Sequence, residues 1–306
     1  MSFFLVGGPH EESLPAVCDE FVAELRDHAG PATPDQPPAR VAVVGAGPAT
    51  RRGEDLDTLA TVVTSRWPEA RVVPVFLDGP GTSPHGEGID EADAWPENPD
   101  FALPPDLDTV TGIIVADGWL PGLLAGLGPA AESLSRLVRG GAPWLGFGAG
   151  AMATSVTALA GGWRLQGRQV AHREHGRGYE EVTLVEGLGL VSLTVATRND
   201  AVQGDSLLLS TLEAGLITSA VALDEGTCLR VDATTGRTAV LGEGLVRWFT
   251  ADPAGVVVRH ERGAGSPAPQ APVRPRFEGL ARVAAATRAA HERQASATTD
   301  EQGPTI

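Results

Sequence analysis

Cysteine is scarce in this chain of 306 residues, which has only two, Cys18 and Cys228. Two cysteines so far apart in the sequence do not make a disulfide framework, so we expect free thiols in a reducing compartment. No stretch approaches the roughly 20 apolar residues of a membrane span. The apolar run at the N-terminus is short and lacks a basic region before it, which is unlike a secretory signal. These absences favour a soluble cytoplasmic protein.

Positive charge is also scarce: the chain has 23 lysines and arginines but 39 acidic residues, and its formal net charge is −16. Such a surface repels phosphate backbones, so we expect no nucleic-acid partner. Hydrophobic residues make up 42% of the chain. At this length they are enough to bury a full core, as one large domain or two small ones.

Apolar runs and amphipathic segments alternate along the first half of the chain. Strands are predicted at 3–6, 41–44, 72–77, 112–115 and 144–147. Helices are predicted at 11–28, 56–67, 130–138 and 151–159. Strands that alternate with helices form a parallel sheet covered on both faces. We therefore predict an α/β fold, a three-layer sandwich with a mostly parallel central sheet flanked by helices.

The pattern changes after residue 180, where strand-like runs follow one another. Strands are predicted at 181–185, 193–196, 227–231 and 239–242, a helix at 206–214, and further ordered segments at 246–249 and 255–258. Glycine, proline and acidic residues fill 79–105, which we interpret as a long surface insertion. We expect the domain to span 1–262, followed over 263–306 by a linker, a helix and a disordered tail.

The segment from Pro143 to Met152 combines an apolar run with a cluster of small residues. It predicts a strand, a sharp turn at Gly148 and a helix. A nucleophile elbow has this arrangement, because small neighbours let strand and helix approach and the next backbone N–H points into an oxyanion hole. Glycine accepts positive φ freely, so we expect a relaxed turn at Gly148.

The order of motifs resembles the cyanophycinase and peptidase E family of serine peptidases, which shares its α/β architecture with class I glutamine amidotransferases. The elbow of that family reads approximately Gly-Thr-Ser-Ala-Gly-Ala, and residues 146–151 align with it without a gap. Residues 5–8 resemble its first strand and Gly-Gly turn, 187–190 its Gly-Leu-Gly-Leu segment, and 222–228 a later Asp-Glu segment. The resemblance covers roughly residues 3 to 250 and implies the same fold.

The alignment places other residues where the family has its catalytic groups. Gly148 stands at the nucleophilic serine, Asn199 at the histidine and Thr197 at the aspartate. Glycine has no nucleophile, and an asparagine amide takes up no proton near neutral pH, so the ordinary serine mechanism is not expected. The resemblance leaves a remnant pocket, for which we expect Asp117, Gly118, Gly148, Ala149, Asn199 and Glu225.

With these departures, the resemblance implies a non-catalytic homologue of the peptidases. Its ligand would be a peptide or a small amide, and its partner an active relative or a second copy of the chain. No cofactor and no metal is implied. The alternative is a hydrolase on the same scaffold with a displaced nucleophile. Thr154, Ser155 and Cys228 are the residues to consider, although we expect the first two to pack within a helix and Cys228 to be a buried structural thiol.

Two further motifs point to other ligands. His172 and His175 have the spacing of two metal ligands on one helix face, but a zinc site needs three or four ligands, so we interpret them as part of a polar surface loop. The run Gly45-Ala46-Gly47 follows a strand as in a dinucleotide fingerprint, but Thr50 replaces the third glycine and no helix clearly begins there. A dinucleotide site would require this turn to open directly onto a helix N-terminus.

Overall fold

The computed structural model describes residues 2–8, 14–31, 37–46, 49–77 and 107–263, without the side chains of 49–55 and 108. The insertion predicted at 79–105 lies outside these residues. So does the segment from 264 to 306, for which a linker, a helix and a tail were predicted. Within them, no helix is long and apolar enough to cross a membrane.

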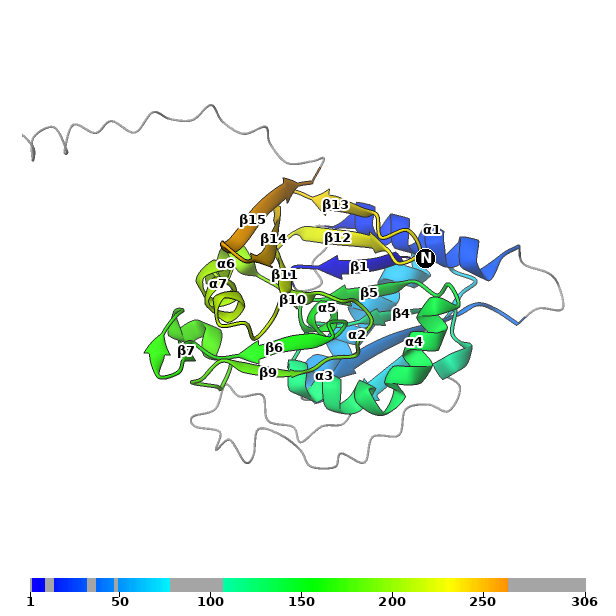
Figure 1. Cartoon of the computed structure of the whole chain (residues 1–306). Coiled ribbons are helices and arrows are strands. Elements are labelled where there is room, and N and C mark those ends of the chain that lie inside the picture. Colours follow the sequence, from blue (N-terminus) through cyan, green and yellow to red (C-terminus); the bar gives the residue numbers. More distant parts are fainter. Residues whose placement is uncertain (1, 9–13, 32–36, 47–48, 78–106, 264–306) are drawn as a thin grey trace, which may run out of the picture. The chain divides into compact units, whose positions relative to one another are not determined.

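A seven-stranded sheet lies at the centre of the described structure (Figure 1). Its order is β13-β12-β1-β5-β4-β2-β3. The strands β1 to β5 pair in parallel, whereas β12 is antiparallel to β1 and β13 to β12. This confirms a mixed α/β fold with a mostly parallel sheet. The strands are β1 (Ser2–Val6), β2 (Arg40–Ala46), β3 (Arg71–Leu77), β4 (Gly112–Val115), β5 (Trp144–Phe147), β12 (Thr227–Asp232) and β13 (Thr238–Gly242).

Strands β1, β2, β4 and β5 are buried on both faces, whereas the edge strand β3 is partly exposed. Successive side chains of a strand point to opposite sides. Phe4 and Val6 pack on one face, in a cluster with residues of helices α1 and α2. Phe3 and Leu5 pack on the other, with residues of α3 and α4. Burial on both faces explains why these strands are continuous apolar runs in the sequence. The helices are α1 (Pro15–Ala29), α2 (Ala49–Thr64), α3 (Leu120–Leu127) and α4 (Ala131–Arg139).

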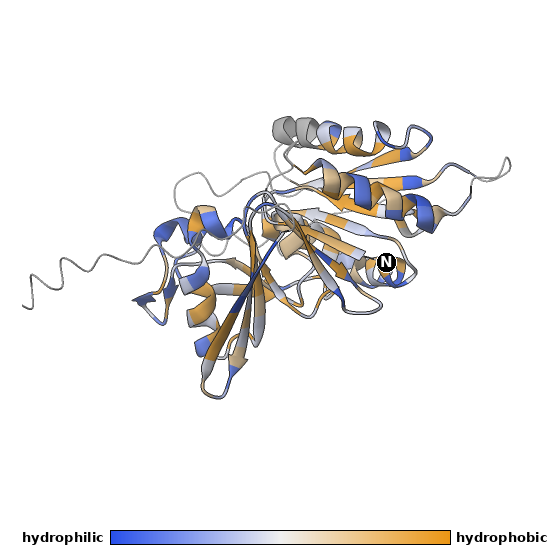
Figure 2. Cartoon of the chain, turned by 90° about the horizontal axis from the view of Figure 1, so that it is seen from above, coloured by the Kyte–Doolittle hydropathy of each residue, from blue (hydrophilic) through white to orange (hydrophobic). Residues whose placement is uncertain are grey.

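The second half of the chain adds a four-stranded sheet with the order β10-β11-β14-β15. Helix α7 packs on it through three leucines that share a cluster with Phe249 of β14. Figure 2 shows hydrophobic residues along the strands and hydrophilic residues among the surrounding helices. The elements are β6 (Thr157–Gly161), β7 (Arg164–Leu165), β8 (Arg168–Gln169), β9 (Thr183–Glu186), β10 (Thr194–Ala196), α6 (Asn199–Val202), α7 (Asp205–Glu213), β11 (Ser219–Leu223), β14 (Leu245–Asp252) and β15 (Gly255–Arg262), with short 3-10 helices at Leu107–Thr109, Gly128–Ala130 and Arg173–Gly176.

The helix predicted at 151–159 is wrong. Helix α5 covers only Ala149–Met152, and the chain then turns into strand β6. Hydroxyl side chains take part in ending the helix: Thr154 Oγ1 donates to the carbonyl three residues earlier (2.7 Å), and Ser155 Oγ accepts from a backbone N–H of β10 (3.0 Å). Hydroxyls that bond to the backbone compete with helical hydrogen bonds, and this competition outweighed the apolar spacing on which the prediction depended.

Two other helices differ from the prediction. Helix α2 begins at Ala49 rather than at residue 56, so a helix does follow the Gly45-Ala46-Gly47 run. Helix α3 was not predicted, because it contains proline and two glycines, which are poor helix formers. One of these glycines is explained by packing: a Cβ at Gly126 would lie 2.8 Å from a methyl carbon of Leu77, so glycine lets α3 approach β3 closely.

We predict that Gly150→Ala destabilises the fold by about 1–3 kcal/mol, the usual cost of overpacking. A Cβ at Gly150 would lie 2.5 Å from the carbonyl oxygen of Val115, where α5 crosses β4. Gly128 is the matched control, because it has helical φ and ψ and a Cβ there would meet nothing within 4 Å. In urea unfolding we expect Gly128→Ala to leave stability unchanged or to raise it by up to about 1 kcal/mol. Equal losses in the two variants would contradict the close contact of α5 with β4.

Candidate functional site

Gly148 alone makes the turn between β5 and α5. Its φ is 49° and its ψ −112°, a conformation that is strained for any residue with a side chain. The turn is fixed on both sides: Gly148 N donates to Val6 O of β1 (3.0 Å), and Met152 N donates to Gly148 O (3.1 Å). The predicted strand-turn-helix geometry of the elbow is therefore confirmed.

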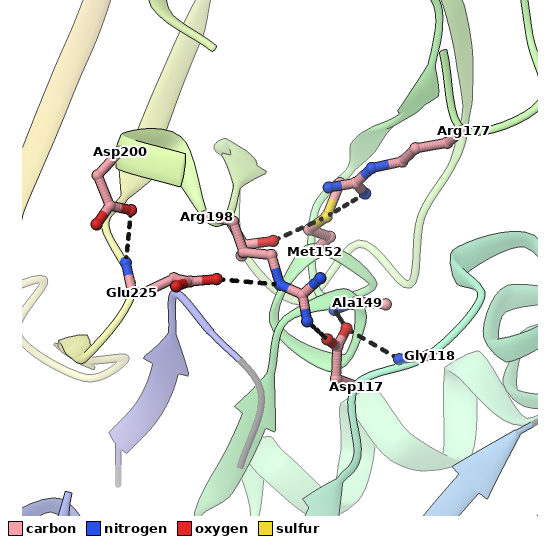
Figure 3. Close-up of polar contacts among 9 residues, drawn as sticks. Asp117, Gly118, Ala149, Met152, Arg177, Arg198, Asp200 and Glu225 are labelled. Carbon is pink, nitrogen blue, oxygen red and sulfur yellow. Dashed lines mark hydrogen bonds and ion pairs between the residues drawn. The ribbon is translucent and has the colours of Figure 1, made fainter. Parts of the chain in front are cut away.

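The carboxylate of Asp117 lies against this elbow (Figure 3). Asp117 follows strand β4, and its Oδ1 accepts from the backbone N–H groups of Gly118 (2.9 Å) and Ala149 (2.8 Å). Its Oδ2 accepts from Arg198 Nη2 at 2.7 Å. One carboxylate thus receives three hydrogen bonds, one of them assisted by charge. The Ala149 N–H is the group that a nucleophile elbow would direct at an oxyanion, and here it is bonded to Asp117.

The same carboxylate occupies the space beside the Cα of Gly148. A Cβ added to Gly148 would lie 2.1 Å from Asp117 Oδ1 and 2.3 Å from its Cγ, far inside van der Waals contact. A serine at this position would have to displace Asp117 as well as adopt positive φ. Gly148 and Asp117 are therefore complementary, because the missing side chain of one leaves the space for the carboxylate of the other.

Arg198 connects the elbow to a second carboxylate. Its Nε lies 3.6 Å from Glu225 Oε1, while its Nη2 contacts Asp117. The backbone of Arg198 is left-handed, with φ of 57°, and its N–H donates to Gly7 O at the end of β1 (2.6 Å). Glu225 is held in turn by its own N–H, which donates to Asp200 Oδ1 (2.9 Å). These contacts align Asp117, Arg198 and Glu225 across the carboxyl ends of the strands, as Figure 3 shows.

A second arginine, Arg177, reaches toward the elbow from the opposite side (Figure 3). Its Nη1 donates to the thioether sulfur of Met152 on α5 (3.2 Å). Burial lowers the pKa of Arg177, with the Asp117 carboxylate acting to raise it and Arg198 to lower it further. Sequence reasoning missed both arginines. Arg198 could have been expected near the elbow, because it lies between Thr197 and Asn199, the two residues that the alignment singled out.

The structure brings together four of the six residues expected in the remnant pocket, namely Asp117, Gly118, Gly148 and Ala149. A fifth, Glu225, is connected to them through Arg198.

Asn199 is directed elsewhere. It is only 3% exposed, and its Nδ2 donates to Asp205 Oδ1 (2.8 Å), a carboxylate that also lies 3.7 Å from Arg247 Nε. Thr197 is buried as well and contacts Met152 through its hydroxyl (3.4 Å). Asn199 is thus engaged in a network that holds α6 and β14, and no contact of its side chain reaches the Asp117 carboxylate in the described residues.

The candidates for a displaced nucleophile have structural partners. Thr154 and Ser155 are fully buried and bond to the backbone. Both cysteines are buried and free, and burial raises the pKa of each thiol, that of Cys228 strongly. A protonated buried thiol is a poor nucleophile. The expectation of a buried structural thiol at Cys228 agrees with this environment.

The two histidines do not share one environment, contrary to the surface loop that the sequence predicted. His172 is exposed, but His175 is 7% exposed and its Nε2 donates to Val202 O. Burial lowers the pKa of His175. Among the residues with described side chains, no group of three or more His, Cys, Asp or Glu could hold a metal ion.

No family model matches the chain, and no curated protein matches it by sequence. Solved structures do match. A peptidase from an acI-B1 actinobacterium superposes with a TM-score of 0.55 at 17% identity, over 86% of this chain and 94% of that one. The chain shares the fold of this peptidase. A candidate peptidase E protein from Listeria monocytogenes gives a TM-score of 0.46 at 12% identity, over 79% of this chain and 98% of that one. The match to the actinobacterial peptidase confirms the peptidase-like fold implied by the sequence resemblance.

We predict that Gly148→Ala lowers the unfolding free energy by about 2 kcal/mol or more, because it adds both strain at positive φ and a clash with Asp117. In an Asp117→Gly background the clash is gone, so the same change should cost less by about 1 kcal/mol or more. A double-mutant cycle in urea measures this difference. Strictly additive effects would show that Asp117 does not occupy the space beside Gly148.

Proposed function

We propose that this chain is a non-catalytic homologue of the cyanophycinase and peptidase E serine peptidases, which binds a peptide or a small amide and does not cleave it. The observation that carries the proposal is the Asp117 carboxylate in the space that a side chain at residue 148 would need. The peptidase fold supports the scaffold part of the proposal. The chemistry of the elbow supports the rest.

Acyl transfer at such an elbow needs a nucleophile, a base and a site for the oxyanion. The nucleophile has no replacement at Gly148, and Asn199, at the base position, bonds to Asp205. The oxyanion site is altered too, since the Ala149 N–H donates to Asp117. A negative carboxylate at that point would repel a developing oxyanion instead of stabilising it. All three requirements therefore fail in ways that a single substitution does not repair.

The resemblance to these peptidases also supports proposals about the type of scaffold, the cellular location, the cofactors and the partners. The scaffold is a three-layer sandwich of the class I glutamine amidotransferase type spanning 1–262, and the protein acts in the cytoplasm without a cofactor. Partner binding, by an active relative or a second copy of the chain, is the other use that a non-catalytic scaffold of this type would have. The buried environments of Thr154, Ser155 and Cys228 do not favour the alternative, a hydrolase with a displaced nucleophile.

The test is turnover of β-aspartyl and aspartyl dipeptides by the purified chain, followed by amine release. We expect none, and we expect the double variant Gly148→Ser with Asn199→His to stay inactive, because a serine at 148 can enter the elbow only by displacing Asp117, and the side chain at 199 is directed toward Asp205. Hydrolysis by the unmodified chain that a serine-directed fluorophosphonate abolishes would contradict the proposal. Mass spectrometry of the labelled protein would then identify the nucleophile.

A further inference from the structure

We propose that the elbow is a carboxylate-binding site, which Asp117 occupies in the free protein and from which a ligand carboxylate displaces it. The inference rests on the proposed binding function and names the chemical class of the ligand: a small molecule or chain end with a free carboxylate.

Donors from three separate segments converge on the Asp117 carboxylate. Two are the backbone N–H groups of Gly118 and Ala149, and the third is the Arg198 guanidinium. Backbone N–H groups combined with an arginine are the usual means by which proteins hold a carboxylate. The Asp117 carboxylate can leave these donors by rotation of its own short side chain. The same three donors could then bind the carboxylate of a ligand.

The site also offers more donors than Asp117 uses. Arg198 Nε is buried without a hydrogen-bond acceptor, because Glu225 Oε1 is too distant for a hydrogen bond at 3.6 Å. The hydrogen bond shown for Arg177 goes to the Met152 thioether, a weak acceptor. A buried N–H such as that of Arg198 Nε is costly to leave without an acceptor, and a thioether satisfies a guanidinium only weakly. A ligand that brings additional oxygens would satisfy them.

The exposure of the Asp117–Arg198 ion pair and the net charge of the chain both agree with a carboxylate-binding site at the elbow. The side chains of Asp117 and Arg198 are 20% and 39% exposed, so solvent reaches the ion pair that a ligand must open. Because the chain carries a formal net charge of −16, an acidic ligand needs a local positive site to bind at all. An acceptor tethered within the protein competes at a high effective concentration, so the unmodified chain should bind carboxylates weakly.

The experiment measures binding of acetate by thermal shift, with acetamide as the neutral analogue and sodium chloride added to hold ionic strength constant. Asp117→Ala vacates the site, and we expect it to bind acetate at least tenfold more tightly than the unmodified chain does. Adding Arg198→Gln to Asp117→Ala should remove this gain. Glu213→Ala is the control, because it removes an acidic charge from the exposed end of α7 and should leave acetate binding unchanged.

Equal responses of Asp117→Ala to acetate and acetamide would overturn the inference, as would equal responses to acetate and sulfate. If Asp117→Ala does not fold, the unmodified chain is titrated with acetate while the amide resonances of Gly118 and Ala149 are followed by NMR. Selective shifts of these two resonances support the site, and their absence at saturating acetate contradicts it. Dipeptide hydrolysis would contradict the proposed function, whereas a missing acetate response contradicts only this inference.

Discussion

The hydrogen bonds from the Gly118 and Ala149 N–H groups to the Asp117 carboxylate are the contacts on which the elbow depends. Ala149 is buried at the turn that follows β5, where its N–H needs an acceptor, and Asp117 supplies one from the segment after β4. The carboxylate fits only because residue 148 has no side chain. The loss of the nucleophile and the position of Asp117 are therefore one structural feature, and neither residue can change without affecting the other.

Arg198 extends this feature beyond the elbow. It lies between β10 and α6, and its ion pairs connect Asp117, two residues after β4, with Glu225, in the turn between β11 and β12. Both carboxylates are partly exposed, and pairs of this kind contribute about 0–1 kcal/mol each to stability. Their main effect is on position, because they keep a guanidinium beside the N-terminal end of α5. The left-handed backbone of Arg198 and its hydrogen bond to Gly7 O fix that position further.

The architecture was largely predictable from the sequence, because buried parallel strands such as 41–44 and 144–147 are apolar runs that period and composition identify. The short α5 was not, since Thr154 and Ser155 act through bonds to particular backbone groups that spacing does not reveal. Within the site, the elbow motif located Gly148 and Ala149. The direction of the Asp117 carboxylate depends on long-range packing of β4 beside β5, and no local pattern indicates it.

The alignment was also a partial guide to the residues after β10. It drew attention to Asn199, whose side chain bonds to Asp205, whereas its neighbour Arg198 contacts the elbow. Arg198 has a left-handed backbone and Asn199 begins α6, so these neighbouring side chains make their contacts in different places, and a shift of one position decides which side chain enters the site. Contacts of this kind require the three-dimensional arrangement, even where a motif places the segment correctly.

A crystal structure of the unmodified chain without ligand would show whether the Asp117 carboxylate fills the elbow. We expect density for the Asp117 carboxylate beside Gly148, with Oδ1 within hydrogen-bond distance of both Ala149 N and Gly118 N. A carboxylate turned into solvent, with water molecules in the space beside Gly148, would contradict this expectation.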